Sequence, residues 1–410
     1  MTSNYLKITQ SATLWLIVLA CISINLPTAI MSVTNTLLII FWAISGQYKE
    51  KINIIIKNPA SLATLGLIFI YIIGMLYSSV TIPESFKSLM HYHKLLIIPI
   101  IISTLTQTKY QTYALNGFLF SSIASMFISY LKWIGIIPHI DTGEGYIAFK
   151  NRIAGSIIMS LSMYLMLQKA KDSYGKIKYL WIAAALLAIF DIAYLMNGRT
   201  GQLLMISLII WFTYETWDNK CIKYWIACLI LGFIIIQTIP ELPQSRLTNT
   251  QTEIENHNLA GQQTSAGLRL EFYRNSVTLI KENILFGTGT GSFLHEYKQL
   301  AEQQNLISKE VVNPHNQFLL TTEELGLMGL IALCLFWYIP WQTSKHLKTE
   351  FNRLALRALI LTMCIGSLFN SLLFDASEGK FYCILAGVLL SINNTQKHLK
   401  PFNKLNPSNA

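Results

Sequence analysis

One histidine stands where a long polar segment of the chain runs into an apolar one. Residues 313–316 read Asn-Pro-His-Asn, and Gly326 and Gly329 follow at the start of the apolar run. Histidine is the side chain whose unperturbed pKa lies nearest neutrality, so it can accept or donate a proton near pH 7. His315 is therefore a candidate catalytic group, with a solvated histidine at a helix start as the plainer alternative.

Cationic side chains come between apolar runs elsewhere in the chain. Arg199 is the most informative, because its loop is only a few residues long and a permanent cation so close to a membrane is costly without a partner. A lone arginine in such a place can also anchor lipid headgroups. Several cations around one histidine, with carboxylates across the mouth, fit a site that holds a diphosphate and activates a hydroxyl group.

The local sequence predicts how His315 is positioned. Asn313 is a good N-cap and Pro314 suits the first helical position, so we expect a helix to begin there with His315 in its first turn. Gly326 and Gly329 would permit close backbone contact with a neighbouring helix. The polar residues before Leu325 should rise above the hydrocarbon as a continuation of a membrane helix.

The composition indicates a polytopic α-helical membrane protein. Hydrophobic residues make up 52% of the chain and charged residues 13%, and the apolar residues form runs long enough to cross about 30 Å of hydrocarbon. These runs predict an all-α bundle of about 12 transmembrane helices, at 11–28, 30–47, 60–79, 92–106, 112–135, 152–168, 178–196, 201–216, 223–239, 324–341, 354–373 and 381–393.

The same pattern divides the chain into four parts. Residues 1–239 hold spans one to nine, residues 240–323 form one large outer loop, residues 324–393 hold spans ten to twelve, and residues 394–410 form a tail. Within the loop, residues 240–266 are polar and predicted to be mobile, whereas residues 268–281 predict an amphipathic helix against the bundle. The glycine-rich residues 287–291 predict a flexible turn, with a phosphate cradle as the alternative.

Lysine and arginine set the expected orientation. They are concentrated in the short loops on the side of the N-terminus, which places both termini in the cytoplasm and the long loop in the periplasm. The net charge of +10 is then mainly a topological signal, and no nucleic-acid partner is expected because the cations are spread over many loops.

Five segments of the chain carry a resemblance to one family. His315-Asn316, followed after nine residues by Gly326 and Gly329, resembles the histidine signature of the bacterial O-antigen ligases, and further similar segments lie at 151–154, 198–201, 267–270 and 370–375 with 378–379. The resemblance covers nearly the whole chain. It implies a GT-C-like membrane bundle in the bacterial inner membrane with a periplasmic active site.

The activity that this resemblance implies is glycan transfer from undecaprenyl diphosphate to a hydroxyl group of the lipid A-core. It implies an inverting enzyme that needs no metal, nucleotide or other cofactor, and its essential residues correspond to His315, Arg199 and Arg269. Further substrate-binding roles are expected at Arg152, Lys150, Asn316, Arg274, Asp375 and Glu378. Asp375 or Glu378 could instead orient the histidine or an arginine.

Three other functions remain open from the sequence. O-antigen polymerases and protein O-oligosaccharyltransferases share the superfamily and much of the histidine region. A transporter or flippase would also have about twelve spans, although no internal repeat supports it. Asp191, in the predicted seventh span, could pair with a cation near the outer surface or serve as a buried structural residue.

Overall fold

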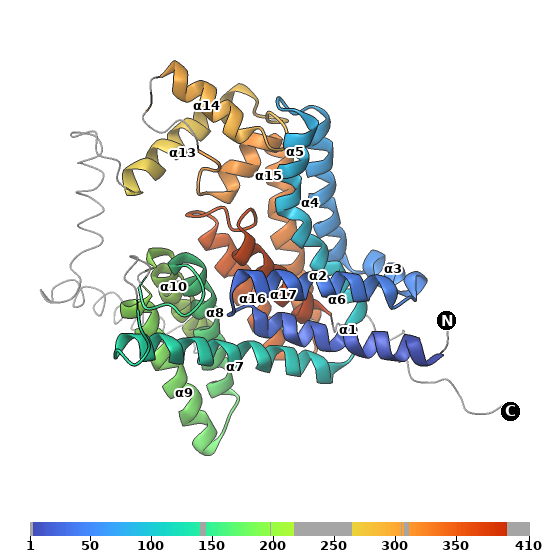
Figure 1. The fold of residues 1–410 in the computed structure, drawn as a ribbon, viewed down its shortest axis with the longest axis vertical. Coiled ribbons are helices and arrows are strands. Elements are labelled where there is room, and N and C mark those ends of the chain that lie inside the picture. Colours follow the sequence, from blue (N-terminus) through green and yellow to red (C-terminus); the bar gives the residue numbers. More distant parts are fainter. Residues whose placement is uncertain are drawn as a thin grey trace, which may run out of the picture.

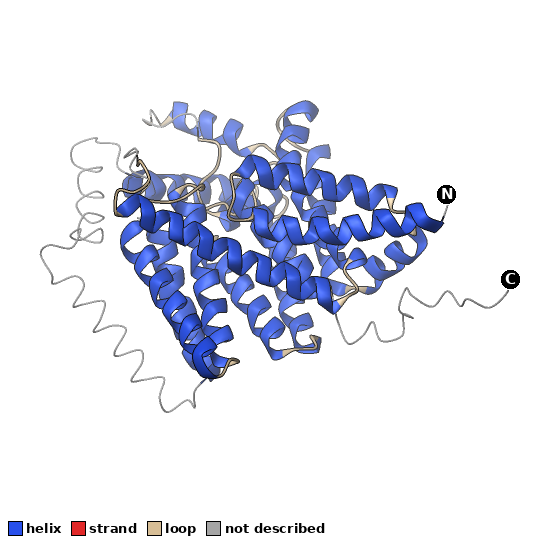
Figure 2. Cartoon of the chain, turned by 60° about the horizontal axis from the view of Figure 1, so that its bottom comes forward, coloured by secondary structure: helices blue, strands red, loops and turns tan. Residues whose placement is uncertain are grey.

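The structure is a computed structural model that describes residues 3–139, 145–196, 198–216, 265–304, 306 and 311–391. Every regular element in these ranges is a helix (Figures 1 and 2), which confirms the all-α prediction. The predicted ninth span at 223–239, residues 240–264 of the polar segment and the tail at 394–410 lie outside the described residues.

The helices follow one another with short connections. Up to residue 216 they are α1 (Ser3–Ser23), α2 (Thr28–Ile44), α3 (Tyr48–Lys57), α4 (Pro59–Leu76), α5 (Ile82–Leu89), η1 (Met90–Leu96), α6 (Ile97–Thr104), α7 (Thr108–Trp133), α8 (Arg152–Lys171), α9 (Gly175–Phe190), η2 (Asp191–Leu195) and α10 (Arg199–Thr216). From residue 265 they are α13 (Ser265–Glu282), α14 (Phe293–Gln303), α15 (Gln317–Thr343), η3 (Ser344–His346), α16 (Glu350–Gly366) and α17 (Ala376–Leu390).

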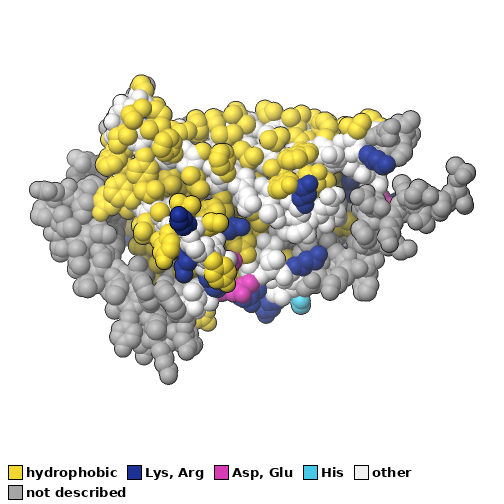
Figure 3. All heavy atoms as spheres, turned by 90° about the horizontal axis from the view of Figure 1, so that it is seen from below, with side chains coloured by type: hydrophobic (Ala, Val, Ile, Leu, Met, Phe, Trp, Pro, Cys, Tyr) yellow, Lys and Arg dark blue, Asp and Glu magenta, His cyan; other side chains and the backbone are white. Residues whose placement is uncertain are grey.

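Among the described residues, six helical stretches are long and apolar enough to cross a membrane. They are Tyr5–Ser23, Pro59–Leu76, Thr108–Trp133, Arg152–Lys171, Gly175–Leu195 and Gln317–His346. A seventh is present if α2 and α3, bent by 117° relative to each other, count as one span. Figure 3 shows hydrophobic side chains gathered along one edge of the face drawn, with most lysine and arginine side chains away from that edge. These features indicate a membrane protein.

The helix α17 lies at the centre of the bundle. It packs against α6, α16, α8, α7 and α1, and nearly all of its side chains are buried. The closest approach to α6 is at Gly387, where a Cβ atom would lie 2.9 Å from the Cβ of Ile101. The loop that leads into α17 is therefore fixed to the most buried part of the fold.

Two predicted spans are not single helices. The stretch predicted at 92–106 is divided between η1 and α6, and α6 alone rises only about 12 Å. The stretch predicted at 354–373 is also interrupted, because α16 ends at Gly366 and residues 367–375, here called the 367–375 turn, are not helical. The side chain of Gln317 explains part of this break, since its Oε1 accepts the N–H groups of Leu373 (2.9 Å) and Phe374 (3.1 Å).

The helix α15 is kinked at Gly326, which has φ 62° and ψ −158°. Only glycine adopts this backbone region readily, and a Cβ atom there would lie 2.3 Å from the carbonyl group of Leu285. The predicted close contact at Gly326 is thus real, but its partner is the loop after α13 and not a neighbouring helix. At Gly329 a Cβ atom would meet Leu325 and Thr321 of the same helix.

The loop after α13 replaces the hydrogen bonds that the kink removes. The N–H groups of Thr288 and Gly289 donate to the carbonyl groups of Glu323 (3.0 Å) and Glu324 (2.7 Å). In return, the N–H of Leu327 donates to the carbonyl of Ile284 (2.9 Å). Buried backbone groups must find partners, so this exchange fixes the loop and the upper part of α15 to each other.

The predicted amphipathic helix at 268–281 is confirmed by α13, which packs against α15 and α14. Phe272, Ser276 and Leu279 are buried, whereas Arg274 and Val277 on the same helix are exposed. Figure 1 shows α13 and α14 together at one end of the molecule, near α5 and the start of α15.

Candidate active site

The 367–375 turn connects segments that are far apart in the sequence. Asn370 Nδ2 donates to Thr200 Oγ1 at 3.1 Å, which ties the turn to the start of α10. Ser371 Oγ donates to Asn313 Oδ1 at 3.0 Å, and the backbone after it is held by Gln317. The turn therefore holds the first residues of α10 and the segment before α15 in one place.

His315 lies just before α15 in an unusual backbone conformation. Its φ angle is 54°, a left-handed value that is uncommon for residues other than glycine. The surrounding structure maintains it, because the N–H of His315 donates to Asn313 Oδ1 at 2.9 Å and its carbonyl accepts from Tyr273 Oη at 3.3 Å. Such strained positions persist only where neighbouring contacts fix them, and they cluster at functional sites.

The helix that follows His315 begins later than predicted. The sequence placed the N-cap at Asn313 and the histidine in the first turn, but α15 begins at Gln317 with Asn316 as its N-cap. The Oδ1 of Asn316 accepts the N–H groups of Phe318 (2.9 Å) and Leu319 (3.1 Å). The predicted cap was wrong because Asn316, three residues closer to the apolar run, can satisfy these N–H groups just as well.

Asn316, an expected substrate-binding residue, is held by contacts within the protein. Its Oδ1 is occupied by the two cap bonds, its Nδ2 donates to the carbonyl of Leu368 at 3.0 Å, and the residue is buried. These contacts make Asn316 a positioning residue that joins α15 to the 367–375 turn.

The imidazole ring of His315 is half-buried against α13. It stacks on the ring of Phe272, with 6.2 Å between centroids and 28° between planes. Burial lowers the pKa of His315, and the nearby charge of Arg269 lowers it further. A histidine whose pKa lies below its usual value is neutral at pH 7, so this imidazole can accept a proton.

Two glycines bring Arg199 next to Arg152. At Gly198 and Gly201 a Cβ atom would lie 2.2 Å from side-chain atoms of Ser156, so the start of α10 can approach α8 only with glycine at these positions. Arg199 is the first residue of α10 and Arg152 the first of α8, and both are exposed.

Arg269 reaches the same cluster from α13. Burial lowers the pKa of Arg269, Tyr273 opposes this shift, and the charges of Arg199 and Arg152 lower the pKa further. Charges act on one another in this way only at short range, so the three guanidinium groups share one region, with His315 beside Arg269. Like charges held together at a protein surface attract an anion, and guanidinium groups bind phosphate oxygens in bidentate fashion.

The other predicted site residues divide into two groups. Arg274 is exposed on α13, five residues after Arg269 and therefore on a different side of the helix, so the structure does not bring it into the arginine cluster. Lys150 precedes α8 and lies near Glu378, which is in the first turn of α17. Burial lowers the pKa of Lys150 to about 8, and the carboxylate of Glu378 opposes that shift.

Asp375 and Glu378 face lysines and not the histidine. Burial raises the pKa of Asp375 to about 6, with the charge of Lys94 acting against the shift. Burial also raises the pKa of Glu378 to about 7, and the nearby charge of Asp375 adds to this rise. Lys94 and Lys150 lower the same pKa. The charge that acts on the pKa of His315 comes from Arg269. The prediction that one of these carboxylates orients the imidazole or an arginine stays a prediction.

The glycine-rich residues 287–291 are not arranged to hold a phosphate. Each of their five N–H groups donates within the protein: to Asn283, to the carbonyls of Glu323, Glu324 and Gly74, and to Glu324 Oε1. An anion-binding loop needs free N–H groups that point at the ligand. The segment instead serves to fix the kink of α15.

Sequence reasoning missed the residues that position His315. Tyr273 donates to the carbonyls of His315 and Leu368, and Gln317, fully buried, caps the 367–375 turn. In the sequence, Gln317 directly after His315-Asn316 was the signal for such positioning contacts, because an amide that becomes buried must have hydrogen-bond partners. The residues joined by these bonds lie 42 to 95 residues apart in the sequence, so the pairs could not be read from spacing.

Comparison with known proteins finds similarity to one family. A family model described as O-antigen ligase matches residues 182–334, a stretch that includes Arg199, Arg269 and His315. An uncharacterized protein of Haemophilus influenzae is 25% identical over 209 residues, which cover 48% of this chain and 50% of that protein. The chain thus spans about half the length of this curated relative. The match over residues 182–334 thus supports the O-antigen ligase family for this part of the chain.

Proposed function

We propose that this chain is an O-antigen ligase of the bacterial inner membrane. In this proposal it transfers a glycan from undecaprenyl diphosphate to a sugar hydroxyl of the lipid A-core, inverting the anomeric centre without a metal ion. The bundle has about twelve spans, both termini are cytoplasmic, and the cluster of His315 and the arginines faces the periplasm. The observation that carries the proposal is the grouping of one neutral imidazole with three guanidinium groups that come from α8, α10 and α13.

The chemistry assigned to this cluster has two parts. His315 takes the proton from the acceptor hydroxyl as the hydroxyl oxygen attacks the anomeric carbon from the face opposite the diphosphate. The bond from that carbon to the phosphate oxygen breaks, and its electron pair leaves with the lipid diphosphate. Arg199 and Arg269 hold the negative charge that develops there, with Arg152 beside them. No acid is needed on the leaving-group side, because diphosphate is a good leaving group.

The substitution His315→Ala tests the proposal. It should reduce glycan transfer by about a hundredfold to ten-thousandfold, the usual contribution of a general base. The variant should still insert into the membrane at the wild-type level, and lipid-linked glycan should accumulate in the cell. Normal attachment of O-antigen to the core by the variant would remove the base assignment.

A deletion strain separates ligase from polymerase activity. Loss of a ligase leaves long lipid-linked chains and bare core, whereas loss of a polymerase leaves single repeat units attached to the core. We expect the first phenotype, read from a lipopolysaccharide gel together with the lipid-linked fraction.

A further inference from the structure

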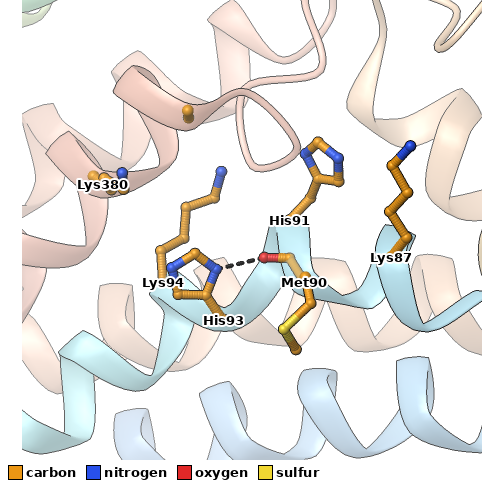
Figure 4. A pocket seen from close by; sticks show the side chains of 7 residues that line it. Lys87, Met90, His91, His93, Lys94 and Lys380 are labelled. Atoms are coloured by element: carbon orange, nitrogen blue, oxygen red, sulfur yellow. Dashed lines mark hydrogen bonds between the residues drawn. The ribbon is translucent and has the colours of Figure 1, made fainter. Parts of the chain in front are cut away.

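A second cationic site lies away from the arginine cluster, between η1 and the start of α17. A pocket of about 260 Å³ is lined by Lys87, Met90, His91, His93, Lys94 and Lys380, and no aspartate or glutamate lines it. Figure 4 shows Lys87, His91 and Lys94 rising on the same side of the α5–η1 segment, while Lys380 comes from α17. None of these residues has a role in the proposed transfer reaction.

Two of the lysines are almost fully buried. Lys94 is 2% exposed, and its Nζ donates to the carbonyl of Phe374 at 3.0 Å and to that of Asp375. Lys380 is 7% exposed, and its Nζ donates to Ser32 Oγ at 2.6 Å. An ammonium group has three N–H donors, and these partners are neutral oxygens. Burying such a cation is costly unless an anion accompanies it.

The carboxylates closest to Lys94 do not close this pocket. Asp375 and Glu378 act on Lys94 electrostatically, but neither lines the cavity. Gly379 lets the lysine side chain pass close to the backbone of α17, because a Cβ atom there would lie 2.5 Å from Lys94 Cε. Lys94 is thus a buried cation that lines the pocket.

The ring of His91 lies close to the positive charges that line the pocket. The ring of His91 stacks on Phe374 with 4.0 Å between centroids. Burial lowers the pKa of His91, and the charges of Lys94, His93 and Lys87 lower it further, against a backbone contact with Phe374 that raises it. The lysine charges that lower the pKa of His91 would be stabilised by a bound anion.

An apolar stripe leads from the membrane side into this pocket. Ile82, Phe86 and Met90 follow at helical spacing along α5 and into η1, and they are 70%, 52% and 41% exposed. Residues four apart lie on one helix face, and an exposed apolar face beside lysines is typical of a helix at a membrane interface. Met90 belongs to both the stripe and the pocket lining, so the two are continuous.

We propose that this pocket binds the phosphate group of an anionic membrane lipid whose acyl chain lies along Ile82, Phe86 and Met90. The lipid can be a bulk phospholipid or a phosphorylated lipid A, which share this chemistry. The site is separate from the arginine cluster, and nothing in it depends on glycosyl transfer. It would bind its ligand even in a chain without transferase activity.

The test uses the full-length chain in a neutral detergent and measures binding of dioctanoyl phosphatidic acid. We expect phosphatidic acid to bind at least tenfold more tightly than dioctanoyl phosphatidylcholine, and the difference to shrink as salt is added. Lys380→Gln should weaken binding of phosphatidic acid about tenfold, and Lys87→Gln, on the exposed rim, severalfold. The matched control is Lys178→Gln, an exposed lysine of α9, which should bind like the wild type.

A second arm separates this site from the proposed active site. Arg199→Gln should retain the binding of phosphatidic acid. If Arg199→Gln loses this binding while Lys87→Gln keeps it, the inference is overturned. Equal affinity for the two lipids would overturn it as well. If Lys380→Gln does not fold, Lys87→Gln still decides the question, because its side chain lies at the exposed rim. Diphosphorylated lipid A in the same assay identifies the source, since the tighter of the two anionic lipids is the ligand.

Discussion

The charge state of His315 follows from two neighbours with different effects. Phe272 stacks on one side of the ring and helps to remove it from water. The positive charge of Arg269 makes a second positive charge, on the imidazole, unfavourable. Both favour the neutral imidazole. A base that is already deprotonated at pH 7 needs no partner carboxylate to remove a proton from it first.

This charge state predicts a pH dependence. The folded pKa of His315 is lowered from 6.5, so the active neutral form predominates at pH 7 and above and is lost as the pH falls through the lowered pKa. We therefore expect kcat/KM for glycan transfer to be flat above pH 7 and to decrease toward pH 5. A rate that increases on acidification would mean that the imidazolium is the active form.

Two carboxyl groups titrate in the same range and need a control. The pKa is about 6 for Asp375 and about 7 for Glu378. The pH profile of Glu378→Gln should keep its acidic limb if that limb belongs to His315. Loss of the limb in this variant would assign it to the carboxyl pair.

The arginine cluster offers a matched pair of substitutions. Arg199→Lys keeps the charge but removes the planar fork that holds two phosphate oxygens, so we expect transfer to decrease roughly ten- to a hundredfold, as for one charged hydrogen bond. Arg274→Lys makes the same chemical change at an exposed position of α13 and should leave the rate unchanged. If Arg199→Lys is fully active in the same membranes, Arg199 serves only as a membrane anchor.

At the scale of elements, the kink of α15 decides where His315 stands. The upper turns of the helix continue in a direction set by the loop after α13, which takes over the hydrogen bonds around Gly326. Burial of this junction is tight, since a Cβ atom at Gly326 has no space beside Leu285. The kink is therefore a fixed structural feature and not a point of flexibility.

Substitution at the kink should be costly. Gly326→Ala places a side chain in a glycine-only backbone region against the Leu285 carbonyl, so we expect a loss of about 3 kcal/mol in stability and a lower Tm in detergent. Gly66→Ala in α4 is the control, because a Cβ atom there meets nothing within 4 Å and alanine favours a helix. Equal Tm values for the two variants would contradict the assigned role of Gly326.

For the whole molecule, the predicted orientation can be tested with a pair of cysteines. Tyr174, 90% exposed, lies in the connection between α8 and α9 that the sequence assigns to the cytoplasm, and Val312, 58% exposed, precedes His315 on the predicted periplasmic side. In a chain whose six native cysteines are replaced, an impermeant maleimide added to spheroplasts should label Val312→Cys and spare Tyr174→Cys. The reverse pattern would invert the topology.

The sequence predicted the class of fold and proposed which residues form the candidate site, for reasons that can be named. Apolar runs and helical spacing are local signals, and they identified the bundle and α13. The predicted orientation assigned the loops that hold His315, Arg199, Arg269 and Arg152 to one side of the membrane. This assignment alone grouped the four residues.

The features that the sequence did not predict depend on partners distant in the chain. The shift of the N-cap to Asn316 depends on Leu368 and the 367–375 turn, and the break at Gly326 depends on backbone groups some 40 residues earlier. Lys94 and Lys380 of the second cationic site are separated by more than 280 residues. Local patterns contain no information about such encounters.

The hydrogen bonds of the 367–375 turn have a mechanical consequence. The turn is hydrogen-bonded to Thr200, one residue after Arg199, and to Asn313, which in turn accepts the N–H of His315. A displacement of the turn therefore moves the proposed proton acceptor, His315, and the proposed anion-binding residue, Arg199, together. The distance between His315 and Arg199 should therefore be preserved even when the helices around them tilt.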